Sequence, residues 1–559
     1  MNQLGGFPLL TLIVALPALG ALISIAVPRE RRDTLRWLAI LIAASDLIIA
    51  LLLNLGWVED SLGGLQFVDG PWAWLGSLGT TYHLGVDGLN LHLVLLTALT
   101  SLLLMLAPPE ETDQIKRQTI LALVLETALL GALVSQDLVP LAIFWLMAMV
   151  VVFLLLAQEP RQATSAAQFL GAAALVALAF IIAIAIALAN TEGTNLHHLQ
   201  EAALPWRTQM WIFIPLLIAC AITSATFPLH TWFPTLCREK PTLTQIWVSS
   251  LMLNLGGYGL IRLCLRTWPL AAASATPMLL VIGTLGILYA ALAARGQKSL
   301  AHVLAYWRVA QNGLLLIGVF TMEDVGLHGS IIQLSGMSLA MTALQLLLRE
   351  QPSTDSAGAS PAANRWLVRL PALSAIGLPG LVGFVGQGLL VMQICKWNWF
   401  ASESEFTNAL LDWGWRTLVT AGLLIGIGAL VRATRTILRS AVPGRDQQAQ
   451  VVLPLVLLVV LLGTYATLVS DVIGPTVYRT LAEVRTTIQR DLQNLVPAQP
   501  EESQEPQEQE PEPFVPLGPD QEEPAGNRFQ PPPQRPALSS VRTTRQTTLA
   551  ITARRTVNT

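Results

Sequence analysis

Six ionisable side chains lie in or beside long apolar stretches of this sequence, where charged residues are rare. They are Asp46, Glu126, Asp137, His230, His302 and Arg308. Carboxyl and imidazole groups in such places can bind and release protons when burial and nearby charges move their pKa values. An ionisable residue inside a membrane is functional by default. The chemistry that these residues suggest is therefore proton binding or the pairing of buried charges.

Four of these residues also have a structural interpretation. Arg308 and Glu126 are candidates for a buried ion pair, and we favour a structural pair over a proton relay because arginine does not deprotonate. His230 follows Pro228 in the run FPLHTW, where it would either admit protons or hold the turn by a hydrogen bond. We favour the turn. Asp137 precedes an apolar stretch, so we expect it to cap that helix.

Cysteine usage and net charge exclude several classes of protein. The four cysteines are far apart, and no CxxC pair or Cys/His ligand spacing occurs. We therefore expect neither disulfide bonds nor a metal site. The formal net charge is −3, which favours neither nucleic acid nor an anionic membrane surface as a partner.

The apolar composition predicts one large membrane domain. The chain of 559 residues is 53% hydrophobic and 12% charged, with a mean hydropathy of +0.56, whereas soluble domains carry about 25% charged residues. A spanning helix needs about 20 apolar residues, and about fourteen such stretches occur. They lie near residues 7–27, 36–56, 88–107, 118–134, 136–157, 166–189, 210–229, 243–264, 274–294, 300–320, 326–348, 370–394, 415–435 and 450–471. The first has no basic region before it and no small-residue cleavage site, so we expect a retained span rather than a signal peptide.

Proline interrupts two of these stretches. Pro228 lies in the seventh and Pro379, within GLPGLVGFVG, lies in the twelfth. Proline removes a backbone donor, so the freed carbonyl groups need protein or water as partners. Two broken helices five spans apart are typical of an inverted five-helix repeat. A simple kink in each helix is the alternative.

The C-terminal part of the chain has a different character. Residues 473–496 alternate apolar and charged positions at helical spacing, which predicts an amphipathic surface helix after a transmembrane domain over residues 1–472. Residues 497–559 are expected to be disordered, because their composition cannot bury enough apolar surface. Their first part is acidic and their last part is rich in arginine. We favour a solvated tail over a docking role for the basic end.

Three motifs occur in order along the chain: FPLHTW at 227–232, LNLGGYGLIR at 253–262 and GLPGLVGFVG at 377–386. Together with YHLGVDGLNLHL and SQDLVPLAIFW, they resemble the antiporter-like membrane subunits of complex I (NADH–quinone oxidoreductase), in the branch of subunit 4 or chain M. The opening FPLLTLIVALPALG resembles the cyanobacterial and plastid form. The resemblance covers roughly residues 7–472 and suggests a divergent cyanobacterial-type paralogue.

The resemblance implies a fold. It implies an all-α polytopic membrane protein with about fourteen transmembrane helices. Spans 4–8 and 9–13 would form two inverted five-helix repeats, with broken helices at spans seven and twelve. In that family, buried lysine and glutamate side chains carry protons across the membrane.

Seven positions that carry titratable groups in the family are substituted here. The resemblance places family proton-path positions at Leu146, Gln168, Thr223, Asn254, Gln311, Met337 and Gln387. Thr, Asn and Gln can hydrogen-bond to water, but they do not hold a proton near pH 7. A charge at the bilayer centre costs about 2.5–3.5 kcal/mol, so a charge that serves no function is expected to be lost. We therefore expect the proton path of this chain to be impaired.

Three functions follow from the resemblance. The first is a membrane-arm subunit, or divergent paralogue, of a complex I-type NAD(P)H–quinone oxidoreductase, in which this chain is at most a non-catalytic subunit of a proton-translocating enzyme. The second is a subunit of a multi-subunit Na⁺/H⁺ antiporter. The third is a non-conducting structural or assembly subunit.

The expected surroundings of the chain follow from the same resemblance. We expect no cofactor in this chain, while the parent complex would use quinone and NAD(P)H or ferredoxin. The expected partners are other membrane-arm subunits and the lipid bilayer, with no nucleic acid. The expected location is the thylakoid or the bacterial inner membrane.

Overall fold

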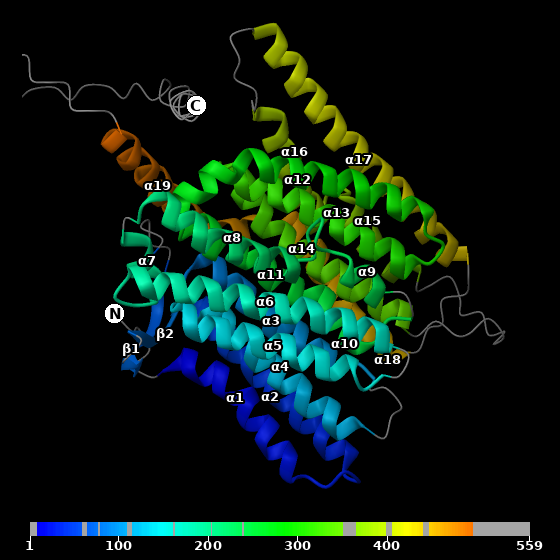
Figure 1. Cartoon of the computed structure of the whole chain (residues 1–559). Helices are drawn as coiled ribbons and strands as arrows, with labels where there is room; N and C mark the ends of the chain where they lie inside the picture. Colours follow the sequence, from blue (N-terminus) through cyan, green and yellow to red (C-terminus); the bar gives the residue numbers. More distant parts are fainter. Residues whose placement is uncertain are drawn as a thin grey trace, which may run out of the picture. The chain divides into compact units, whose positions relative to one another are not determined.

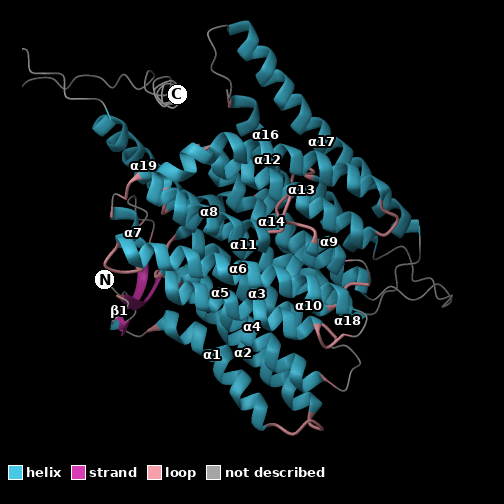
Figure 2. Ribbon diagram, viewed as in Figure 1, coloured by secondary structure: helices cyan, strands magenta, loops and turns pink. Residues whose placement is uncertain are grey.

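The computed structural model shows a chain that is largely helical (Figure 1, Figure 2). It describes residues 8–58, 64–76, 79–108, 114–159, 162–202, 204–237, 240–349, 365–397, 405–439 and 446–495. The chain divides into a compact unit over residues 1–487 and a second unit over residues 488–559. The expected disordered tail lies outside the described residues, so its disorder stays a prediction.

The first half of the described chain contains a hairpin and nine helical elements. These are α1 (Leu9–Ala26), α2 (Arg32–Leu55), β1 (Gln66–Leu75), β2 (Thr80–Val86), α3 (Gly88–Leu106), α4 (Ile115–Val134), α5 (Leu138–Leu156), α6 (Ala163–Asn190), α7 (Leu196–Glu201), α8 (Trp206–Thr223) and α9 (Trp232–Leu236). One long span then follows as four consecutive segments: α10 (Leu243–Trp247), the π-helical η3 (Val248–Met252), α11 (Leu253–Gly259) and the π-helical η4 (Leu260–Arg266).

The second half continues with helices α12 to α19. They are α12 (Pro269–Gly296), α13 (Leu300–Phe320), α14 (Asp324–Arg349), α15 (Arg365–Ile376), α16 (Val382–Lys396), α17 (Glu405–Arg439), α18 (Asp446–Thr464) and α19 (Thr467–Leu495). Within the described residues, twelve helices or continuous spans are long and apolar enough to cross a membrane, and the bent pair α18 and α19 raises the number to thirteen. The remaining expected span, 370–394, is divided between the shorter apolar helices α15 and α16.

The surfaces of the outer helices are apolar, as lipid contact requires. Large apolar side chains that stand more than half exposed include Leu22, Leu41, Ile181, Trp211 and Leu424. Soluble proteins rarely expose apolar side chains on this scale. The innermost elements are the span Leu243–Arg266 and helices α13 and α14, which are almost wholly buried. The chain is an integral multi-pass membrane protein.

The hairpin is the one described departure from the all-α expectation. Strands β1 and β2 pair antiparallel, with Gln66 opposite Val86 and Trp72 opposite Tyr82 (Figure 2). The hairpin is tied to the first helix by the Asp69 carboxylate, which accepts hydrogen bonds from the backbone N–H and the hydroxyl of Thr11. The all-α expectation is therefore wrong for these residues, where aromatic and β-branched side chains favour strands.

The seventh span is interrupted, as Pro228 predicts. Helix α8 ends at Thr223, and the short helix α9 begins only at Trp232. The indole N–H of Trp232 donates to the carbonyl of Ile222 at 3.0 Å, and the Asn312 side chain donates to the carbonyl of Ser224. Protein groups thus satisfy carbonyl groups at the break, as an apolar surrounding demands.

The twelfth span is interrupted in the same way at Pro379. Helix α15 ends at Ile376 and α16 begins at Val382. Gly377 and Gly380 in the break have φ angles of +86° and +88°, a conformation that glycine adopts without strain. Both predicted breaks are therefore present. The equivalence of the two halves as inverted repeats stays a prediction.

The glycine-rich run LNLGGYG lets the central span approach its neighbours closely. A Cβ atom at Gly256 would lie 2.3 Å from the backbone nitrogen of Ser224, and one at Gly259 would lie 2.6 Å from the ring of Trp145. Small residues permit this kind of close helix packing in membranes. The motif therefore fixes α11 against the broken end of α8 and against α5.

The amphipathic segment near the C-terminus is part of a longer helix than expected. Helix α18 ends at Thr464, and α19 begins at Thr467 after a bend of 65°. The helix therefore begins six residues before position 473, and the expected domain boundary at 472 falls inside it. Its buried stripe is Val469, Ile473, Val477, Leu481 and Val484.

Candidate functional site

Thr223, which the resemblance places at a family lysine position, makes a neutral contact with Trp145, the residue before the expected glutamate position Leu146. The indole N–H of Trp145 on α5 donates to the hydroxyl of Thr223 at 3.0 Å. Thr223 is the last residue of α8 and also donates to the carbonyl of Ala219 at 2.8 Å. Leu146 is only partly buried beside this contact. Neither side chain of the contact can exchange a proton near neutral pH.

Asn254, on the central span, faces the positive charge of Arg308. The side-chain amide oxygen of Asn254 on α11 accepts a hydrogen bond of 2.6 Å from the Arg308 guanidinium on α13. Arg308 is 1% exposed, and its Nε atom has no hydrogen-bond partner in the described part of the chain. The resemblance predicts a lysine of the family at Asn254, and here the cation beside this position is Arg308, which belongs to α13. Arginine stays charged, so this group cannot pass a proton on.

Uncharged polar side chains lie beyond Arg308 on the central helices. We call Asn254, Arg308, Gln311, Gln333, Ser249 and Gln345 together the polar axis. Gln311 on α13 accepts a hydrogen bond of 2.7 Å from Gln333 on α14. Met337 lies one turn further along α14 and is buried. Ser249 donates to Gln345 at 2.5 Å. Such side chains can order water, but they do not store protons.

The remaining two family positions lie at the edges of this axis. The Gln387 side chain on α16 donates to the carbonyl of Ala375 at 2.9 Å, which satisfies a backbone acceptor at the broken twelfth span. Gln168 lies on an exposed face of α6 and not in the interior. The structure therefore brings Thr223, Asn254 and Gln311 to the central helices and leaves Gln168 outside them.

Two further sequence expectations concern the ends of helices. Asp137 is the N-cap of α5, where its carboxylate accepts from the backbone N–H of Val139 at 3.1 Å, so that expectation is confirmed. His230 lies against the rings of Phe227 and Tyr289. Its Nδ1 atom has no hydrogen-bond partner among the residues that the structure describes. The ring also has a hydrogen-bond interaction with the backbone of Pro228, so the backbone of the turn and the aromatic packing both hold it.

The expected ion pair between Arg308 and Glu126 is wrong. Arg308 donates to Asn254, whereas the charged neighbour of Glu126 is Asp46. The two carboxylates lie on α4 and α2, and no described ion pair includes either of them. Sequence spacing could not separate these possibilities because all three groups lie in different spans.

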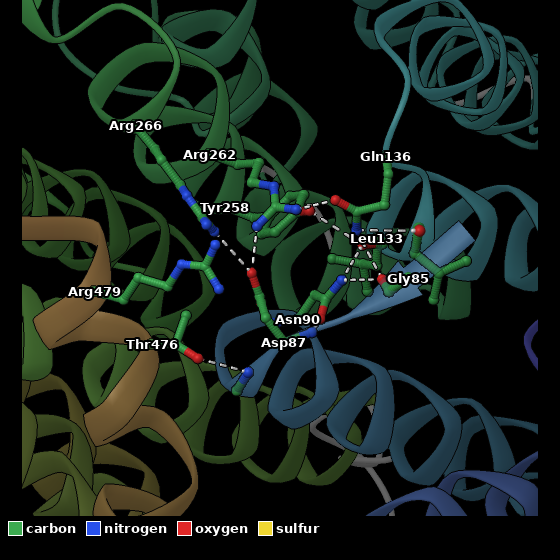
Figure 3. Close-up of polar contacts among 12 residues, drawn as sticks. Gly85, Asp87, Asn90, Leu133, Gln136, Tyr258, Arg262, Arg266, Thr476 and Arg479 are labelled. Carbon is green, nitrogen blue, oxygen red and sulfur yellow. Dashed lines mark hydrogen bonds and ion pairs between the residues drawn. The ribbon is translucent and has the colours of Figure 1, made fainter. Parts of the chain in front are cut away.

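A second polar cluster lies where α3, the central span and α19 meet, and Figure 3 labels Asp87, Gln136, Arg262 and Arg266 among its members. Asp87, the N-cap of α3, accepts hydrogen bonds from the guanidinium groups of both Arg262 and Arg266. Arg262 also donates to the side-chain oxygen of Gln136, and Arg266 contacts the Glu483 carboxylate at 3.1 Å. We call this set the Asp87 network.

The Asp87 network is further fixed by neutral hydrogen bonds. Asn90 donates to the carbonyls of Gly85 and Leu133, and the Tyr258 hydroxyl donates to the carbonyl of Leu133 at 3.1 Å (Figure 3). The Thr476 hydroxyl accepts from the backbone N–H of Gly88 at 2.9 Å. These contacts join the hairpin, α3, α4, the central span and α19.

Electrostatics in the Asp87 network favour the ionised carboxylate. Burial alone would raise the pKa of Asp87, but the neighbouring Arg262 and Arg266 guanidinium groups hold this pKa below its usual range. A carboxylate that two arginines hold ionised does not release and rebind protons at neutral pH. The network is therefore suited to holding helices together.

Sequence reasoning missed the Asp87 network. Asp87 lies in the run GVDG, and the two arginines end an apolar span with a spacing of four residues, Arg262 and Arg266. Two basic residues at this spacing lie on one face of a helix. That pattern was the available signal, but it does not indicate which carboxylate they meet.

The described residues contain no group of three or more His, Cys, Asp or Glu side chains that could hold a metal ion. The cysteines are all free thiols, and Cys220, Cys237 and Cys264 are buried.

Known proteins with this sequence pattern and fold are membrane subunits. The family model described as "NADH:quinone oxidoreductase/Mrp antiporter, TM" matches residues 135–410. The chain is 31% identical over 405 residues to an NAD(P)H-quinone oxidoreductase chain 4 of Picosynechococcus sp., covering 68% of this chain and 73% of that protein. It is 29% identical over 523 residues to a chain 4 of Synechococcus sp., covering 88% of this chain and 97% of that protein.

Solved structures share the fold at lower identity. A chain of respiratory complex I from Thermus thermophilus is 22% identical with a TM-score of 0.72, covering 86% of this chain and 99% of that chain. A chain of the Mrp complex from Dietzia sp. is 20% identical with a TM-score of 0.70, covering 84% of this chain and 52% of that chain. The protein therefore belongs to the family of antiporter-like membrane subunits that includes the NAD(P)H-quinone oxidoreductase chain 4 proteins.

Proposed function

We propose that this chain is a membrane-arm subunit of a complex I-type NAD(P)H–quinone oxidoreductase, in a thylakoid or bacterial inner membrane. The names of its cyanobacterial relatives and the length over which the Synechococcus protein aligns support this assignment. Its partners are the other membrane-arm subunits and the surrounding lipid. The chain itself is not catalytic and holds no cofactor, while NAD(P)H or ferredoxin and the quinone react on other subunits.

The second part of the proposal is that the polar axis does not conduct protons by the lysine–glutamate mechanism. The observation that carries it is the hydrogen bond between Arg308 and Asn254. A proton carrier must exist in two protonation states, and arginine is held in one. A fixed positive charge in the middle of a proton path also repels an approaching proton.

The neutral contact between Trp145 and Thr223 supports the same conclusion. In a pathway, this location needs a group whose charge changes when the neighbouring subunit changes state. An indole and a hydroxyl keep their charge at every pH of interest. The subunit would then occupy its place in the membrane arm without transferring protons at these positions.

Purification of the tagged chain from its native membrane tests the assignment. We expect other complex I-type membrane subunits to co-purify with it in equal amounts. Co-purification of Na⁺/H⁺ antiporter subunits instead would favour the rival function, for which the fold likeness to the Mrp complex is the specific observation. A chain that purifies alone after mild solubilisation would contradict both functions.

Proton flux measured in vesicles tests the second part separately. The full chain, reconstituted alone, should give no flux above that of empty vesicles when a pH gradient is applied. Arg308→Lys is the matched variant, because lysine can deprotonate when buried and arginine cannot. Robust flux in the unmodified protein that Thr223→Val abolishes would overturn the proposal for the polar axis.

A further inference from the structure

A pair of buried carboxylates lies away from the polar axis, in helices that precede the family-matched residues 135–410. Asp46 on α2 and Glu126 on α4 are both 0% exposed. The two groups interact electrostatically with each other. None of their four carboxylate oxygens has a hydrogen-bond partner in the part of the chain that the structure describes.

The packing of α2 against α4 brings the two carboxylates to one seam. Ile42 and Leu123 belong to one buried cluster together with Ala39 of α2 and Ala21 of α1. Asp46 follows Ile42 by four residues, and Glu126 follows Leu123 by three. Residues at these spacings lie on the same helix face, one turn further on. The interface between α2 and α4, which we call the seam, is therefore apolar at one helical turn and carries the two carboxylates at the next turn.

One hydroxyl group on α3 adds to the polar lining. The Ser101 side chain lies beside Glu126. Ser101 is 0% exposed, and its hydroxyl oxygen has no hydrogen-bond partner of good geometry among the described residues. Three buried oxygen-bearing side chains thus meet here with their hydrogen bonds incomplete. Incomplete hydrogen bonding of this kind indicates a missing ligand or water.

No basic side chain is available to neutralise the pair within the helices that form the seam. Helices α1 and α5, which pack against α4, contain no titratable residue at all. On α2 and α4 the other charged residues lie at the helix starts. The remaining titratable groups on the packed elements α3, β2 and α11 hydrogen-bond elsewhere: His92 with Ser335, Tyr82 with Thr11, His83 with Asn195, and Tyr258 with Leu133.

We propose that Asp46 and Glu126 form a proton-binding site, in which the two carboxyl groups share one exchangeable proton. Two ionised carboxylates in an apolar seam would each carry a desolvation cost of several kcal/mol and would also repel each other. One proton held between an oxygen of Asp46 and an oxygen of Glu126 removes one charge and turns the repulsion into a short O–H···O⁻ hydrogen bond.

The proton is favoured over a metal ion by the number of ligands. Hard cations such as Ca²⁺ take six to eight oxygen ligands, and Mg²⁺ requires an octahedral set. The two carboxylates and the Ser101 hydroxyl offer at most five oxygens, fewer than such a cation needs, whereas a shared proton needs only two. Ser101 would donate to the oxygen of Glu126 that remains negative. This site does not rest on the proposed function, because it lies on other helices and uses other residues.

Infrared difference spectroscopy on the full chain in lipid nanodiscs tests the proposal directly. At neutral pH, the carbonyl band of one protonated carboxyl group should appear and should shift when H₂O is exchanged for D₂O. The variant with both Asp46→Asn and Glu126→Gln should lose this band completely. Asp33→Asn, which changes an exposed carboxylate at the start of the same helix, should retain it in full. Absence of the band in the wild type, or its persistence in the double variant, would overturn the proposal.

The single variants and a sodium titration sharpen the test. Asp46→Asn should keep a band of equal intensity at a shifted position, because Glu126 then holds the proton without a carboxylate partner, and Glu126→Gln should do the converse with Asp46. A band that neither change moves would place the proton elsewhere. Replacing choline by Na⁺ should leave the wild-type band unchanged. Loss of the band in Na⁺ would identify a metal cation as the occupant and would refute proton sharing.

Discussion

Buried arginines occur in two regions of this molecule, and their surroundings differ sharply. In the Asp87 network, Arg262 is 4% exposed and meets a carboxylate and an amide oxygen. On the polar axis, Arg308 is 1% exposed, and its only hydrogen bond within the described chain is to the neutral side chain of Asn254. The first region pairs its charges, and the second leaves one charge uncompensated.

The contrast separates two uses of a buried charge. A paired charge holds helices in register, because removing one partner leaves the other desolvated and alone. An unpaired buried charge lowers stability, so it is expected only where it serves another purpose. For Arg308, the purpose that we propose is an electrostatic barrier to protons on the polar axis. The Asp87 network, in contrast, is a clamp between α3, the central span and α19.

The largest expected effect follows from breaking the clamp. Asp87→Ala should lower the free energy of unfolding by about 3–5 kcal/mol, because it leaves two buried guanidinium groups without their shared carboxylate. Thermal unfolding of the purified protein in detergent measures the change. Asp33→Ala, at an exposed position, is the matched control and should have almost no effect. A loss below about 1 kcal/mol would place Asp87 in the class of weak surface pairs.

A charge swap on the polar axis should have the next largest effect. Asn254→Lys adds a second cation beside Arg308 and should destabilise the protein by about 2.5–3.5 kcal/mol, the cost of an uncompensated charge in the membrane. Combining it with Arg308→Gln should restore most of that loss, since the position then carries one cation again. The two changes should therefore be strongly non-additive in a double-mutant cycle. Additive effects would mean that the two side chains do not share one site.

The acid stability of the clamp should show the direction in which folding moves the pKa of Asp87. The folded-state pKa of Asp87 lies below its unfolded value, so its contribution is fully present above the unfolded value of about 3.9. It should be lost as the pH falls further, through the folded-state pKa. Asp87→Asn should therefore flatten the pH dependence of the free energy of unfolding in this acid window, and a tenfold change in proton affinity on folding corresponds to about 1.4 kcal/mol. Equal acid sensitivity of both proteins would show that Asp87 does not titrate in this range.

The smallest effect is expected from the C-terminal tail. Deleting residues 497–559 should change the free energy of unfolding by less than about 0.5 kcal/mol, because its composition cannot form a packed core. Membrane insertion and the melting temperature of the truncated chain provide the measurement. Rapid degradation of that chain would show that the tail belongs to the folded unit. The tail would then contribute to stability in addition to the clamp.

The sequence by itself determined the features that depend on short stretches of chain. Hydropathy located the spans, because a bilayer selects for about 20 consecutive apolar residues. Pro228 and Pro379 located the two broken helices, because a missing backbone donor acts on its own turn. The motifs identified the family, and the resemblance predicts that Leu146, Thr223 and Asn254 stand where the family carries titratable groups.

Only the tertiary structure decided which polar groups meet. Arg308 lies 54 residues from Asn254 in sequence, and Arg262 lies 175 residues from Asp87. The sequence suggested Glu126 as the partner of Arg308, yet the folded chain places Glu126 beside Asp46. The reason is physical: hydropathy fixes how far a residue lies along its own helix, but the rotation and packing of separate helices determine which side chains face each other.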